Sequence, residues 1–176
     1  MKKTGLTILG LIMMSASFSQ GAFSNQTNIA LERVINDYRY NYNNIRGELL
    51  IRHSGSANFA SKVDIPGSLQ CIITQYGDNQ DTYSWSSMLV ETTEFHLAKS
   101  QFAQLYNQIK NTIIKVEGEK PFILNGKYEE PLEVSTQPPV VFKLLPASGK
   151  FQQLVVELKM QSSENGWRIL LSVNQE

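Results

Sequence analysis

The chain has 176 residues, 41% of them hydrophobic, and its 16 basic and 16 acidic side chains balance to zero net charge. This length suits one ordinary domain with enough apolar material for a core of its own. No run of lysine or arginine supplies the basic surface that binds nucleic acid, so we expect no nucleic-acid partner.

The N-terminal residues have the order of a secretory signal peptide. Two lysines precede an apolar run at residues 6–14, and small residues then allow cleavage after Ser19 or after Gly21. That run is too short for a stable membrane-spanning helix, so we expect no integral membrane span once it is removed. The protein is therefore predicted to be exported, and the sequence leaves periplasmic and extracellular locations open. Without residues 1–19 the net charge is about −2.

A polar spacer is assigned to residues 20–27, and a single domain to residues 28–176. The first expected element is a helix, because apolar side chains recur every three or four residues from Leu31 to Ile45. Gly47 is a plausible stop for this helix.

Four short strands are expected next, separated by turn residues such as Pro66-Gly67. Their spacing predicts an antiparallel meander. The expected strands are residues 48–53, 59–65, 69–76 and 82–90.

The strongest periodic pattern in the chain predicts a second helix over residues 94–113, with Phe102 on its apolar stripe. Asn125-Gly126, a favoured hairpin dipeptide, is expected to join a strand at 122–124 to another at 127–134. Three further strands are expected at residues 140–146, 151–161 and 167–174.

The predicted order is helix, about four strands, helix, about four strands. We expect an α+β two-layer domain, in which an antiparallel sheet of about seven or eight strands carries two helices on one face. This α-β4-α-β4 order resembles that of small cystatin-like modules and of tandem α-β4 inhibitor modules. The resemblance covers the order of elements and assigns no role to any residue.

Cys71 is the only cysteine, so the chain cannot form an internal disulfide. Strand alternation places it with Ile73 on the more apolar side of its strand. No basic side chain lies within several residues to favour the thiolate. We therefore interpret Cys71 as a buried, unreactive thiol.

His53 ends the first expected strand, and His96 lies in the first turn of the second helix, away from its apolar stripe. These histidines and Cys71 are far apart in sequence and lack the spacing of metal ligands. We therefore predict no catalytic residues, no metal site and no cofactor. A cleft that joined either histidine to Cys71 or to a carboxylate would instead indicate an unrecognised hydrolase.

Tyr83 and Trp85 share one face of the fourth expected strand. Such a row of rings either packs in a core or forms a platform on which sugar rings stack. The candidate ligand-binding residues are thus Tyr83, Trp85, His53 and His96.

These observations favour an exported, non-catalytic binding domain whose partner is an envelope or extracellular protein. A first alternative is a binder of small ligands or glycans that uses the sheet-face aromatics, or a cavity between the helices and the sheet. The second alternative is the hydrolase. The sequence leaves the partner, the ligand and the oligomeric state open.

Overall fold

The computed structural model describes residues 20–77, 82–134, 137–146 and 148–176, and the predicted signal peptide lies outside them. Two long helices alternate with two groups of strands. The elements in chain order are α1 (Gln20–Tyr38), β1 (Arg46–His53), β2 (Ser56–Ser61), β3 (Gln70–Tyr76), β4 (Thr82–Thr92), α2 (Phe95–Ile109), β5 (Ile113–Ile114), β6 (Phe122–Gly126), β7 (Val140–Leu145), the short 3-10 helix η1 (Gly149–Phe151), β8 (Leu154–Ser163) and β9 (Gly166–Gln175).

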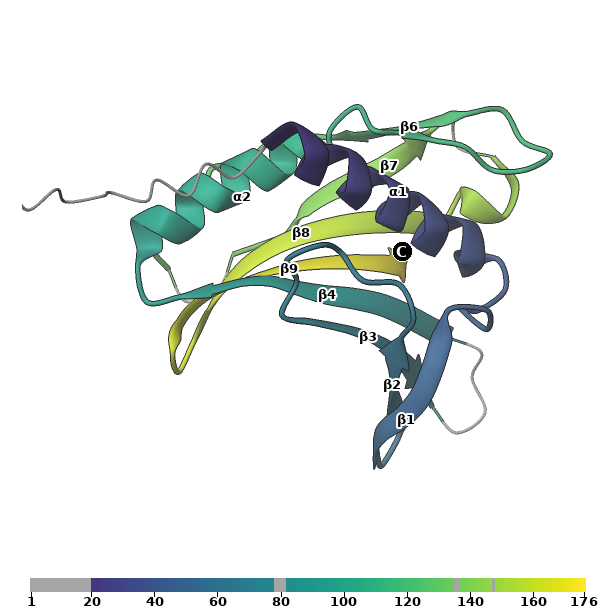
Figure 1. Ribbon diagram of the computed structural model, residues 1–176, viewed down its shortest axis with the longest axis horizontal. Coiled ribbons are helices and arrows are strands. Elements are labelled where there is room, and N and C mark those ends of the chain that lie inside the picture. Colours follow the sequence, from purple (N-terminus) through teal and green to yellow (C-terminus); the bar gives the residue numbers. More distant parts are fainter. Residues whose placement is uncertain (1–19, 78–81, 135–136, 147) are drawn as a thin grey trace, which may run out of the picture.

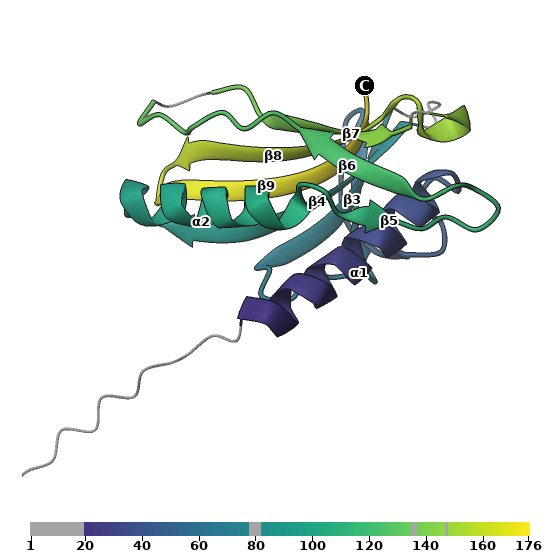
Figure 2. The same cartoon turned by 90° about the horizontal axis from the view of Figure 1, so that it is seen from above.

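All nine strands belong to one antiparallel sheet with the order β1-β2-β3-β4-β9-β8-β7-β6-β5. Two meanders therefore meet where β4 pairs with β9. Both helices lie against one face of the curved sheet (Figures 1 and 2). The predicted α+β two-layer class is confirmed. The count of nine strands is close to the seven or eight expected, and it includes β5, whose two residues are too few to leave a pattern in the sequence.

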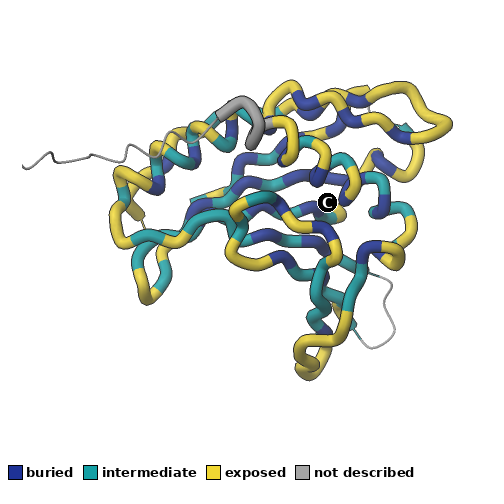
Figure 3. Tube along the Cα trace, viewed as in Figure 1, coloured by how far each residue is buried: buried dark blue, intermediate teal, exposed yellow. Residues whose placement is uncertain are grey.

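The core lies between the helices and the sheet. One row of directly paired side chains crosses six strands on the helix-covered face, and all but the first are fully buried. The row consists of Phe59, Ile73, Trp85, Val173, Val156 and Phe142. Buried and more exposed positions alternate along these strands (Figure 3), as expected for a sheet covered on one face. Helix α2 packs its Phe102 and Ile109 side chains into this core.

The first helix differs from the prediction at both ends. It includes the residues assigned to a polar spacer, and it ends at Tyr38 instead of continuing towards Gly47. Asn41 and Tyr42 adopt left-handed φ angles of 54° and 56°, which end the helical path. Tyr42 and Ile45 are nevertheless buried, because the loop folds back over the same core. The apolar stripe thus predicted correctly that Tyr42 and Ile45 are buried, but predicted incorrectly that they belong to the helix.

The prediction of a hairpin at Asn125-Gly126 is wrong. Strand β6 ends at Gly126 and pairs with β7, and the strand expected at 127–134 does not form. Gly126 is required by a close approach, because an added Cβ would lie 2.7 Å from the Phe142 ring and from the carbonyl oxygen of Val141. The glycine therefore serves strand packing and not a tight turn.

Candidate functional site

The two candidate aromatics occupy different environments. Trp85 has no exposed surface, and its Nε1 donates a hydrogen bond to Ser61 Oγ at 3.0 Å. Tyr83 is half-buried at the margin of the core, with the Arg46 guanidinium 5.3 Å from its ring centroid. A ring enclosed in the core has no face to offer a sugar. In this conformation only Tyr83 is accessible to a ligand.

The two candidate histidines lie at opposite ends of β4 and are both exposed. His53 aligns with the start of β4 through successive strand pairs, whereas His96 follows the end of that strand. Since β4 has 11 residues, this separation is on the order of 30 Å. The His96 ring contacts the Phe95 ring edge-on at 5.8 Å. The structure does not bring the histidines together.

Cys71 lies in the core beside hydroxyl groups. Its Sγ donates to Ser87 Oγ at 3.2 Å and lies 3.4 Å from Ser68 Oγ. The side chain is buried, as predicted. Neither histidine is among these partners, so no cysteine–histidine pair forms.

The β1–β2 hairpin carries the most conspicuous apolar surface. Every residue from Glu48 to His53 is exposed, and three consecutive large side chains, Leu49, Leu50 and Ile51, are each 47–48% exposed. Strand β1 is an edge of the sheet and, among the described strands, pairs with β2 alone. The hairpin extends away from the region that the helices cover (Figures 1 and 3).

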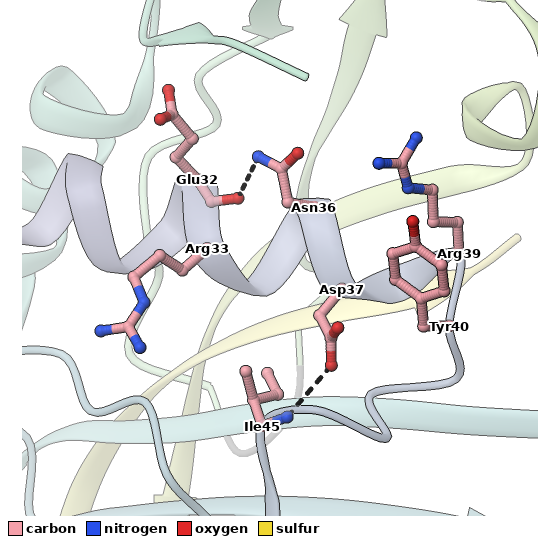
Figure 4. Close-up of a pocket in the computed structure, with 7 residues that line it drawn as sticks. All are labelled: Glu32, Arg33, Asn36, Asp37, Arg39, Tyr40 and Ile45. Carbon is pink, nitrogen blue, oxygen red and sulfur yellow. Dashed lines mark hydrogen bonds between the residues drawn. The ribbon is translucent and has the colours of Figure 1, made fainter. Parts of the chain in front are cut away.

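Two small depressions lie at the C-terminal end of α1. The first, called the α1 pocket here, has a volume of about 260 Å³. Figure 4 shows its lining residues, which are Glu32, Arg33, Asn36, Asp37, Arg39, Tyr40 and Ile45.

Three polar side chains of the α1 pocket, those of Glu32, Asn36 and Asp37, already have partners within the protein. Glu32 Oε2 accepts a hydrogen bond from the backbone nitrogen of Lys115 at 3.0 Å, and Asn36 Nδ2 donates to the Lys115 carbonyl at 2.8 Å. The Asp37 carboxylate accepts from the backbone nitrogens of Asn44 and Ile45. These bonds attach α1 to neighbouring loops, so the α1 pocket has a structural role.

The second depression, called the Tyr83 pocket here, opens between the C-terminal end of α1, the start of β4, the end of β9, and η1. Its volume is about 250 Å³. Its described lining consists of two cationic side chains, three amides and three phenols, with no carboxylate among them. The lining residues are Tyr38, Arg39, Asn41, Tyr42, Tyr83, Lys150, Gln153 and Gln175.

Arg39 belongs to both pockets and is only partly satisfied. Its Cζ lies 4.9 Å from the centroid of the Tyr40 ring, while its Nε is buried without a hydrogen-bond partner among the described residues.

Burial raises the pKa of the Tyr38 phenol. It raises the pKa of Tyr42 well above its usual value, with smaller contributions from Tyr38 and Asp37. Both phenols therefore stay neutral near pH 7 and add no negative charge to the Tyr83 pocket.

The sequence indicated Tyr83 but missed Arg39 and Lys150. The lining residues come from segments up to 137 positions apart, Tyr38 to Gln175, so no local spacing reports them. Arg39 also falls within the stretch predicted to be helical, where an arginine usually faces solvent.

Comparison with protein-family models, with curated proteins and with solved structures finds no match to this chain. Among the residues that the structure describes, no three or more His, Cys, Asp or Glu side chains group in a way that could hold a metal ion. Over the same ranges, neither helix combines the length and apolar character needed to cross a membrane.

Proposed function

We propose that this protein is an exported, non-catalytic domain that binds a partner protein of the cell envelope or the extracellular space through its β1–β2 hairpin. The observation that carries the proposal is the run Leu49, Leu50 and Ile51, which is about half exposed on an edge strand. Consecutive exposed apolar side chains are uncommon in a soluble domain unless a partner covers them. The export component depends on residues 1–19, which lie outside the described residues.

The hairpin geometry favours side-chain docking over addition of a partner strand. The register of β1 against β2 shifts between Arg46 and Leu49 and again between Leu49 and Ile51. Such irregularities interrupt the outer row of backbone hydrogen-bonding groups and hinder edge-to-edge pairing. They also place Leu49 and Ile51 on opposite faces, because Leu49 pairs with Phe59 on the helix-covered face and Ile51 pairs with Asn58 on the other. A partner would therefore need an apolar recess that receives the hairpin.

A crosslinking pull-down of the tagged protein from its own cells, read by mass spectrometry, tests this proposal. The test variant combines Leu49→Ser with Ile51→Ser. The matched control combines Ile113→Ser with Ile123→Ser at the opposite sheet edge, where these paired residues are 56% and 44% exposed. We expect one reproducible partner that the hairpin variant loses and the control variant retains.

The hairpin site would be contradicted if both variants captured the partner equally well, or if both lost it to the same extent. Sedimentation of the purified chain provides a second measurement, because a hairpin buried between two copies would give a dimer that Leu49→Ser and Ile51→Ser dissociate. That result would replace the envelope partner with self-association.

A further inference from the structure

The Tyr83 pocket has the charge of an anion-binding site. Its two cations, Arg39 and Lys150, come from segments more than 100 residues apart, and no aspartate or glutamate among the described residues lines it. The buried Arg39 Nε has no hydrogen-bond partner, and neither cation forms an ion pair among the described residues. A guanidinium presents N–H groups in a planar fork that matches the two oxygens of a carboxylate or phosphate. Arg39, which contacts the Tyr40 ring but forms no ion pair among the described residues, is therefore suited to an oxyanion.

The remaining lining groups suit hydroxyl groups and a small ring. Gln175 Nε2 donates to Gln153 Oε1 at 2.9 Å, which leaves the Gln153 amide nitrogen and the Gln175 carbonyl oxygen for other partners. Asn41 adds a third amide, and the half-buried Tyr83 ring forms an aromatic wall. The volume of about 250 Å³ is below the range of drug-sized sites, which begins at about 300 Å³. The occupant should thus be the size of one sugar ring.

We infer that the Tyr83 pocket binds an acidic monosaccharide, whose carboxylate or phosphate lies against Arg39 and Lys150 and whose hydroxyl groups reach the amides of Asn41, Gln153 and Gln175. This site is separate from the apolar hairpin surface and does not depend on the proposed protein partner. The two binding activities can therefore be tested independently.

Titrations of the isotope-labelled chain, followed by amide and arginine side-chain resonances, test the inference. The probes are glucuronate, glucose-6-phosphate, neutral glucose and inorganic sulfate, each added separately. We expect glucuronate or glucose-6-phosphate to shift the Arg39 Nε–H resonance and the Tyr83 and Gln175 amides to saturation, and glucose to leave them unchanged. The comparison between the two acidic sugars identifies whether a carboxylate or a phosphate is preferred.

Charge-removing variants then locate the anion. Arg39→Gln and Lys150→Gln should each raise the Kd by about tenfold, the effect of one charge-assisted contact. Arg33→Gln is the matched control, because Arg33 is an exposed arginine on α1 that does not line the Tyr83 pocket. It should leave the Kd within about twofold of the wild-type value. Lys150 is exposed, so its variant keeps the test valid if Arg39→Gln disturbs folding.

Several results would overturn the inference. The anion site would be wrong if neither acidic sugar produced saturable shifts, or if Arg33→Gln weakened binding as much as Lys150→Gln. The saccharide assignment would be wrong if sulfate bound as tightly as the acidic sugars, or if glucose bound as tightly as glucuronate. Binding that did not weaken between about 0.05 and about 0.5 M salt would also contradict an ionic contact of this kind.

Discussion

The two halves of the chain have a similar order of elements but bury very different amounts of their strands. In the C-terminal half, β6 to β9 alternate buried and more exposed residues along almost their whole length. In the N-terminal half, β1 has no buried residue and β2 has only Ala57. Strands β1 and β2 therefore contribute little to the core, whereas the strands from β3 onward supply most of its sheet side. A similar order of elements can thus build a scaffold in one half and an accessible surface in the other.

The largest expected effect lies in the well-packed half. Phe102 of α2 is 2% exposed and contacts the Tyr128 ring with a centroid distance of 6.4 Å. Phe102→Ala should lower the free energy of unfolding by about 3–5 kcal/mol, because it removes a buried ring and leaves a cavity. Denaturant unfolding measures this loss. Leu97→Ala, at a 44% exposed position of the same helix, is the control and should change stability little. A loss below about 1 kcal/mol for Phe102→Ala would mean that α2 is not firmly packed.

In the N-terminal half, one buried carboxylate holds the loop that follows α1. The Asp37 carboxylate accepts hydrogen bonds from the backbone nitrogens of Asn44 and Ile45 and from the Asn44 side chain, and so holds the loop after α1. Asp37→Ala should lower the free energy of unfolding by about 2–3 kcal/mol, because it leaves the buried Ile45 nitrogen and the part-buried Asn44 nitrogens without their acceptor. Asp64→Ala at an exposed position should have almost no effect. If the two variants lost equal stability in denaturant, the loop would not depend on this carboxylate.

A smaller effect is expected at Tyr42, where the loop joins the sheet. Its hydroxyl donates to the carbonyl oxygen of Val173 at 2.9 Å, so Tyr42→Phe should cost about 1 kcal/mol at neutral pH. Burial raises the pKa of the folded phenol well above 10.0. Between the unfolded and folded pKa values the unfolded state loses its proton first. Wild-type stability should therefore be fully present below about pH 10 and fall as pH rises further.

Unfolding measured at a series of alkaline pH values tests this linkage. Tyr42→Phe should flatten the decline, although Tyr38 and Tyr128, whose pKa values are also raised mainly by burial, keep part of it. Tyr40→Phe, at a 50% exposed position, should follow the wild-type curve. If Tyr42→Phe declined as steeply as the wild type, the buried phenol would not be the source of the pH dependence.

The difference between the halves also explains which features could be read from the sequence. The stripe through Phe102 predicted α2 well, because burial against a sheet selects apolar residues at helical spacing. The loop at Asn41 and Tyr42 could not be predicted, because a left-handed tyrosine depends on tertiary contacts. Arg39 and Lys150 likewise meet only after folding. Tyr83 was indicated by alternation along its strand, which could not reveal that Trp85 is enclosed.

The smallest effect on stability is expected where the chain exposes most apolar surface. Leu50 lies at the bulged part of β1 and is 47% exposed, so it adds little to the core. Leu50→Ala should change the free energy of unfolding by no more than about 0.5 kcal/mol in denaturant experiments. A loss above about 1 kcal/mol would mean that the hairpin packs on the body of the domain, and that the N-terminal half is not an accessible surface. A neutral result would mean that Leu50 does not serve folding, as the proposed contact with a partner requires.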